Sequence, residues 1–129
     1  MASPDHWQAM QITDAAVFYS RLTKWEETFD HLPVHAISAQ LYFKLAFEPL
    51  SLTTGASSFV VDVSDTLEQK IDSVRCYATQ FPPEKEYVFD RIRGAALQAG
   101  STAGVQAGEM FQMTRALRVG NLMHTLFGA

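Results

Sequence analysis

The sequence has 129 residues, of which 47% are hydrophobic and 19% are charged, a composition that suits one globular domain with one core. The formal net charge is −4 and the ten Lys and Arg residues are scattered, which argues against nucleic acid as a partner. Neither a secretory signal nor an apolar run that could cross a membrane is present, so we expect a cytoplasmic protein.

The first element is predicted to be a helix from about His6 to Lys24. Ser3 can cap it, Pro4 is tolerated in a first turn, and Asp5 is favourable at the positive end of the helix dipole. Its apolar residues spread over a broad face, which favours packing against a sheet. The segment 30–35 contains Pro33 and is predicted to be a loop.

Two strands are expected next. Residues 37–47 alternate between apolar and more polar side chains, which predicts a half-buried strand. After a loop over 49–58, the run 59–63 is almost continuously apolar, a pattern typical of a strand that is covered on both faces.

The carboxyl-terminal half is predicted to be helical. Ser64 and Asp65 are expected to cap a helix that Pro82 and Pro83 stop, with Cys76 buried inside it as a core thiol. A last helical region begins near residue 84 and becomes rich in glycine and alanine through residue 108, which predicts close backbone packing or a broken helix. The apolar tail 115–129 is expected to dock on the body or on a second subunit.

Several segments, in a consistent order and spacing, resemble the carboxyl-terminal region of LmbE/PIG-L deacetylases, particularly the bacillithiol-pathway type. That family has a strand reading Ser-Phe-Ile/Val-Val-Asp-Ile-Ser/Thr-Asp, a helix ending in Tyr-x-Ser-Gln-Phe, and later a Gly-Glu-Ala-Phe segment. The matching segments in this chain are Ser58–Asp65, Glu68–Lys70, Val74–Tyr77, Thr79–Phe81, Arg91–Arg93 and Gly108–Phe111.

The resemblance implies a zinc ligand near the amino terminus. Pro4-Asp5-His6 aligns with the family's His-Pro-Asp-His motif, whose last histidine binds zinc, so His6 is the implied ligand. Ser3 replaces the first histidine of that motif, which is thought to help stabilise the oxyanion, and a serine cannot act as a cationic acid. The other two ligands and the aspartate base come from an upstream His-Pro-Asp-Asp motif that this sequence lacks.

Other residues have weaker implied roles. Asp5 is either a carboxylate that orients a metal ligand or one that stabilises the helix dipole. Gln80 and Glu109 match the family text and either face a substrate pocket or fix helix packing. Arg75, like Arg91 and Arg93, could bind a substrate carboxylate or form ion pairs on a helix face. His31, His35 and His124 are expected to be surface residues.

These patterns favour one partial α/β domain over residues 1–129, the carboxyl-terminal portion of a Rossmann-like LmbE fold that lacks the amino-terminal parallel-sheet half. The implied activity is zinc-dependent hydrolysis of the N-acetyl group of a GlcNAc-containing substrate, with the chain silent alone. A sheet edge left by the missing half favours a homo-oligomer or a partner chain. The alternatives are a non-catalytic oligomerising interaction module derived from that family, and an unrelated small α+β protein.

Overall fold

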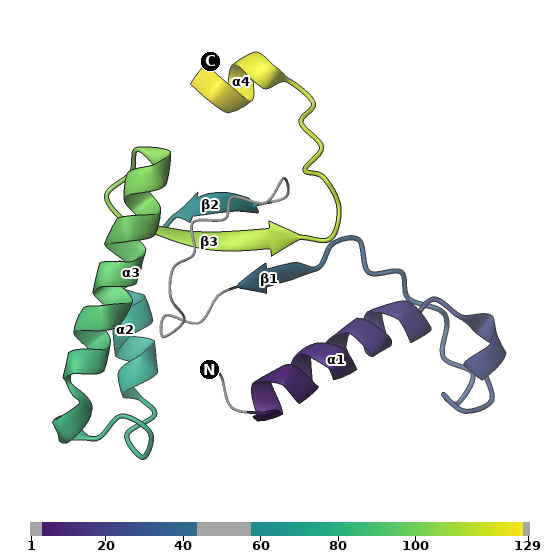
Figure 1. Cartoon of the computed structure of the whole chain (residues 1–129). Helices are drawn as coiled ribbons and strands as arrows, with labels where there is room; N and C mark the ends of the chain where they lie inside the picture. The colour runs from purple at the N-terminus through teal and green to yellow at the C-terminus, as the bar shows by residue number, and fades with distance from the viewer. Residues whose placement is uncertain (1–3, 44–57, 128–129) are drawn as a thin grey trace. The chain divides into compact units, whose positions relative to one another are not determined.

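A computed structural model describes residues 4–43 and 58–127 (Figure 1). The described chain forms two compact units that divide between Gln40 and Leu41. In chain order, the elements are α1 (Pro4–Tyr19), the 3-10 helix η1 (Thr23–Trp25), β1 (Leu41–Phe43), β2 (Ser58–Asp62), α2 (Leu67–Arg75), the 3-10 helix η2 (Pro83–Lys85), α3 (Tyr87–Ala103), β3 (Gly108–Met113) and α4 (Leu122–Phe127).

The first unit consists of α1 and an irregular segment that follows it. The helix begins at Pro4 and ends at Tyr19, so it is shorter at its carboxyl end than the predicted span to Lys24. The segment beyond η1 is a loop, as predicted, and it returns to the end of α1, where the His35 N–H donates a hydrogen bond to the Ser20 carbonyl at 2.8 Å. Gln40 Nε2 donates to Asp14 Oδ1 at 2.6 Å. No residue of α1 is buried.

The second unit is built on a three-stranded antiparallel sheet in the order β1-β3-β2, so β3 is the central strand (Figure 1). The prediction of helix or broken helix for this part of the chain was wrong at β3. Gly108–Met113 has no clean alternation of polar and apolar side chains, and its glycine resembled those of the preceding helix. Hydrogen bonding to two neighbouring strands compensates for a weak local preference.

The two outer strands differ from prediction in extent and burial. β2 corresponds to the predicted strand 59–63, but it lies at an edge of the described sheet and its residues are half-buried or exposed, so burial on both faces was wrong. Of the predicted strand 37–47, the structure has Leu41–Phe43 as β1. Residues 44–57, which include most of the predicted loop 49–58, are outside the described residues.

The core of the second unit lies between α2, α3 and the sheet. α3 contacts both β2 and β3, and α2 packs on α3. Leu67 and Ile71 on α2 pack against apolar residues of α3 that recur every three or four positions and therefore share one face of that helix. The buried cluster consists of Leu67, Ile71, Val88, Phe89, Ile92, Ala96 and Ala107.

Helix ends in this unit are set by different residues from those predicted. α2 follows Thr66 at the N-cap position and ends at Arg75, before Pro82 and Pro83, which instead lead into η2. Ser64 is not the cap of α2. At the end of α3, Gly104 adopts a left-handed conformation with φ of 73°, which glycine tolerates without a steric penalty.

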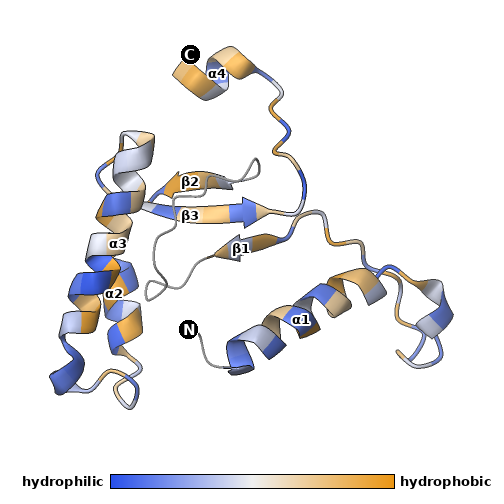
Figure 2. Cartoon of the chain, in the orientation of Figure 1, coloured by the Kyte–Doolittle hydropathy of each residue, from blue (hydrophilic) through white to orange (hydrophobic). Residues whose placement is uncertain are grey.

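Two further predictions concern burial. Cys76, expected in the core, is exposed at the end of α2, because α2 stops at the preceding residue. No residue of α4 is buried, and Leu122, Met123, Leu126 and Phe127 are each more than half exposed. Figure 2 shows the apolar character of this short helix. Docking of the tail on a partner therefore stays a prediction.

Helices and a small antiparallel sheet thus form a mixed fold that is compatible with a broad α/β class.

Candidate functional site

The implied zinc ligand lies at the start of α1. Both Asp5 and His6 are in the first turn of the helix and both are exposed. A carboxylate there interacts favourably with the helix dipole, so Asp5 fits the structural alternative for this residue. Ser3 is outside the described residues.

A catalytic zinc site with His6 as one ligand would require two further protein ligands and one open position. Within residues 4–43 and 58–127, no three His, Cys, Asp or Glu side chains gather into a group that could hold a metal ion. His31 and His35 are exposed in the loop of the first unit, as predicted, and His124 is exposed on α4. The described residues therefore do not form a family-type zinc site by themselves.

Glu109 is positioned by β3 and forms an ion pair with Lys70 of α2. The Lys70 side chain is 40% exposed and that of Glu109 is 28% exposed, so water screens the pair only in part. Both residues belong to segments that resemble the deacetylase family. The contact ties α2 to β3 and gives Glu109 the packing role that was one of its two predicted alternatives.

Asp62 ends β2 and accepts two hydrogen bonds from Ser64, from its backbone N–H at 3.0 Å and from Oγ at 2.6 Å. These bonds, the side-chain one first, lower the pKa of Asp62. Ser64 Oγ also accepts a hydrogen bond from the Ala107 N–H at 3.1 Å, and the Val63 N–H donates to the Ala107 carbonyl at 3.0 Å. The Asp-Val-Ser segment therefore joins the exit of β2 to the entry of β3.

Arg75, a candidate for binding a substrate carboxylate, faces Glu86 instead. Its guanidinium donates through both terminal nitrogens to the two Glu86 oxygens, with Nη1 to Oε2 at 2.9 Å, and it lies 4.1 Å from the centroid of the Phe89 ring. The hydrogen bond lowers the pKa of Glu86 and raises that of Arg75. This is the ion-paired helix face that was the alternative to substrate binding.

Arg93 and Arg91 behave similarly on α3. Arg93 donates to both Glu68 oxygens and lies 3.7 Å from Asp90, and its hydrogen bond lowers the pKa of Glu68. The Arg91 guanidinium lies 5.0 Å from the Tyr87 ring centroid. All three arginines therefore have partners within their own unit.

Gln80 lies in the turn after α2 with its side chain exposed. Its backbone N–H donates to the Tyr77 carbonyl at 2.9 Å, and its own carbonyl accepts a hydrogen bond from Lys85 Nζ at 3.0 Å. The backbone of Gln80 thus helps to form the turn between α2 and η2.

The residues to which the resemblance assigns a role lie in both units. Asp5 and His6 belong to the first, whereas Arg75, Gln80 and Glu109 belong to the second. Within the second unit, the Lys70–Glu109 ion pair and the pairing of β2 with β3 bring family-like segments together.

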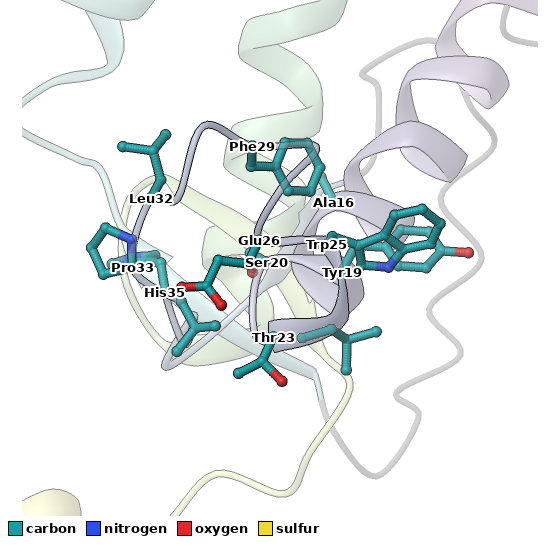
Figure 3. A pocket seen from close by; sticks show the side chains of 12 residues that line it. Ala16, Tyr19, Ser20, Thr23, Trp25, Glu26, Phe29, Leu32, Pro33 and His35 are labelled. Carbon is teal, nitrogen blue, oxygen red and sulfur yellow. The ribbon is translucent and has the colours of Figure 1, made fainter.

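A hollow that the sequence did not reveal is present in the first unit (Figure 3). It lies between the end of α1, η1 and the returning loop, and Tyr19, Trp25, Glu26 and Phe29 contribute to its wall. The available signal was the concentration of aromatic residues between positions 18 and 29, of which Phe18 and Trp25 were assigned to the apolar face of the predicted helix. The turn of the chain after Tyr19, which creates the hollow, was not predicted.

No model of a known protein family matches this sequence. None of the helices in the described part of the chain combines the length and the apolar character needed to cross a lipid bilayer.

Proposed function

We propose that this chain supplies the carboxyl-terminal part of a zinc-dependent deacetylase of the LmbE/PIG-L type, which hydrolyses the N-acetyl group of a GlcNAc-containing substrate. In this proposal the chain is a portion of a Rossmann-like fold, His6 is one of the zinc ligands, and residues outside this sequence carry the His-Pro-Asp-Asp motif. The chain alone is catalytically silent because a single imidazole does not hold a hydrolytic zinc ion.

The observation that carries the proposal is the agreement in order and spacing of the family-like segments over nearly the whole sequence. The contacts of the second unit are compatible with it, since β2 pairs with β3 and Lys70 forms an ion pair with Glu109.

In the complete enzyme, zinc would acidify a water molecule and polarise the acetyl carbonyl. This chain would contribute the His6 imidazole as a ligand, with Asp5 orienting a neighbouring group. Ser3 could donate one hydrogen bond at the position where the family has a histidine.

The direct test combines the purified chain with an amino-terminal half that contains His-Pro-Asp-Asp. We expect about one zinc per complex and release of acetate from an N-acetylglucosaminyl substrate, and neither from the isolated chain. His6→Ala should abolish both, whereas His124→Ala, which changes an exposed histidine on α4, should preserve them. Deacetylation by the isolated chain would contradict the proposal, as would a folded complex that binds no zinc.

The coding region offers a second test. An upstream reading frame that encodes His-Pro-Asp-Asp would support a split or truncated enzyme, whereas an unrelated upstream gene would favour a free-standing module.

A non-catalytic, oligomerising interaction module is the second candidate, and the sheet supplies the observation that favours it. Phe43, Phe111 and Phe59 occupy opposite positions on neighbouring strands and therefore share one face, with the Phe59 and Phe111 rings stacked at 5.9 Å. Phe43 is 68% exposed. Exposed apolar sheet surface is a common site of association between chains.

Sedimentation equilibrium of the wild type and of Phe43→Ser tests this second candidate. A module of the second kind should associate without any second polypeptide, and the serine variant should shift it toward the monomer. A monomeric wild type would remove this candidate.

A further inference from the structure

The hollow in the first unit has the size of a small-molecule site. Its volume is about 640 Å³, and small-molecule sites usually occupy roughly 300–1,000 Å³. Its wall is mainly apolar and aromatic and includes Tyr19, Leu22, Trp25, Phe29, Leu32 and Val34. A surface of this composition favours a ligand with an aromatic or other apolar body.

Backbone hydrogen bonds fix the wall without any ligand. The Phe29 N–H donates to the Trp25 carbonyl at 3.0 Å, the His31 N–H to the Glu26 carbonyl at 2.8 Å, and the Leu32 N–H to the Phe29 carbonyl at 2.9 Å. Tyr19 and Trp25 meet edge to face with their ring centroids 5.9 Å apart. The hollow is therefore largely pre-formed, which reduces the entropic cost of binding.

Glu26 places a carboxylate on the wall, which also includes the His35 imidazole. Figure 3 shows the Glu26 carboxylate between the aromatic side chains and the Leu32–Pro33 side of the loop. No ion pair engages Glu26 within the part of the chain that the structure describes. Arg21 and Lys24 do not line the hollow. Arg21 lies 4.8 Å from the Phe18 ring centroid, and Lys24 Nζ lies 5.0 Å from that of Trp25, which is part of the wall.

Trp25 lines the hollow, but its Nε1 atom is buried and has no acceptor among the described residues. An atom without accessible surface cannot meet a ligand in the hollow, so the indole contributes its ring to the wall and not a hydrogen bond.

We propose that this hollow binds a small organic cation, an amine attached to an aromatic body. The ammonium group pairs with Glu26, and the aromatic body packs among Tyr19, Trp25 and Phe29. Electron-rich aromatic faces beside a carboxylate are a favourable environment for an ammonium group. This proposal is independent of the deacetylase proposal.

The test is a titration of the full ¹⁵N-labelled chain with four related probes, followed by the indole N–H resonance of Trp25. The Trp7→Phe variant identifies that resonance, since the sequence has two tryptophans. Phenylethanolamine carries the amine, the ring and the hydroxyl group. Phenylethanediol replaces the amine by a neutral hydroxyl, mandelate replaces it by a carboxylate, and phenethylamine lacks the hydroxyl.

We expect phenylethanolamine and phenethylamine to shift the Trp25 indole resonance in a saturable way, and the diol and mandelate to bind at least about tenfold more weakly. Glu26→Gln keeps the shape of the side chain and should weaken phenylethanolamine binding by about tenfold. Glu27→Gln removes the same charge from the adjacent exposed residue, which does not line the hollow, and should leave binding unchanged.

Amide spectra of both variants establish that they remain folded. The proposal is overturned by the absence of a saturable shift, by equal binding of the amine and the diol, by tighter binding of mandelate, or by equal effects of the two glutamine variants.

Discussion

Gly100 on α3 and Gly108 on β3 lie close to each other, and the surrounding atoms leave no space for a side chain at either position. A Cβ atom at Gly100 would lie 2.8 Å from the Ala107 Cα and from the Val105 carbonyl oxygen, and one at Gly108 would lie 3.1 Å from the Gly100 Cα. This contact brings the helix against the central strand and lets the chain turn from α3 directly into β3.

Gly100→Ala should destabilise the protein by roughly 1–3 kcal/mol, because the atoms that its methyl group would meet belong to the backbone and cannot rotate away. Urea denaturation followed by circular dichroism measures this loss.

Gly94→Ala is the matched control on the same helix. A Cβ at Gly94 would meet nothing within 4 Å, so alanine should stabilise α3 by about 0.5–1 kcal/mol through its higher helix propensity. Equal stability of the two alanine variants would refute the close packing of α3 on β3.

The Lys70–Glu109 pair is expected to stabilise the contact between α2 and β3 modestly. A double-mutant cycle with Lys70→Met and Glu109→Gln should give a coupling free energy of up to about 1 kcal/mol, because both side chains are partly exposed. The coupling should fall as salt is raised from low to high concentration. A coupling of zero at low salt would show that the pair does not form in solution.

The hydrogen bonds that Ser64 donates to Asp62 predict that the free energy of unfolding falls at acidic pH. They lower the pKa of Asp62 in the folded state, so its contribution to stability is present above the usual aspartate range and is lost as the pH falls through the lowered value. Asp62→Asn should therefore reduce the decline of unfolding free energy between about pH 5 and pH 2. Asp65→Asn measures the effect of a nearby charge change alone, and identical acid profiles for wild type and Asp62→Asn would contradict the prediction.

Arg75→Lys should weaken the junction between α2 and η2. Lysine retains the positive charge but cannot form the forked pair with Glu86 or lie flat over Phe89, so we expect a lower melting temperature. Thermal unfolding of Arg75→Lys beside Arg91→Lys, whose guanidinium lies over the Tyr87 ring, separates loss of the fork from a general change of arginine to lysine. Equal melting temperatures for the two variants would show that the fork adds nothing.

Local sequence determined much of the helical structure of this protein. The periodic apolar residues of α2 and α3, from Leu67 and Ile71 to Val88 and Ile92, form the buried cluster because a helix places residues three and four apart on one face. The breaking effect of Pro33 and the exposure of His31 and His35 also followed from local chemistry. The residues of β2 were identified by their β-branched and aromatic character.

Tertiary contacts decided the rest. β3 is a strand because two neighbouring strands supply its hydrogen-bond partners, although Gly108 and Glu109 have little intrinsic preference for a strand. The partners of Arg75, Lys70 and Ser64 lie 11 to 43 residues away along the chain, so spacing alone could not distinguish an ion pair or scaffold contact from a substrate-binding group. The hollow beside Trp25 exists because the chain leaves the helix at Tyr19 and returns at His35, a path that depends on hydrogen bonds between distant residues rather than on residue type.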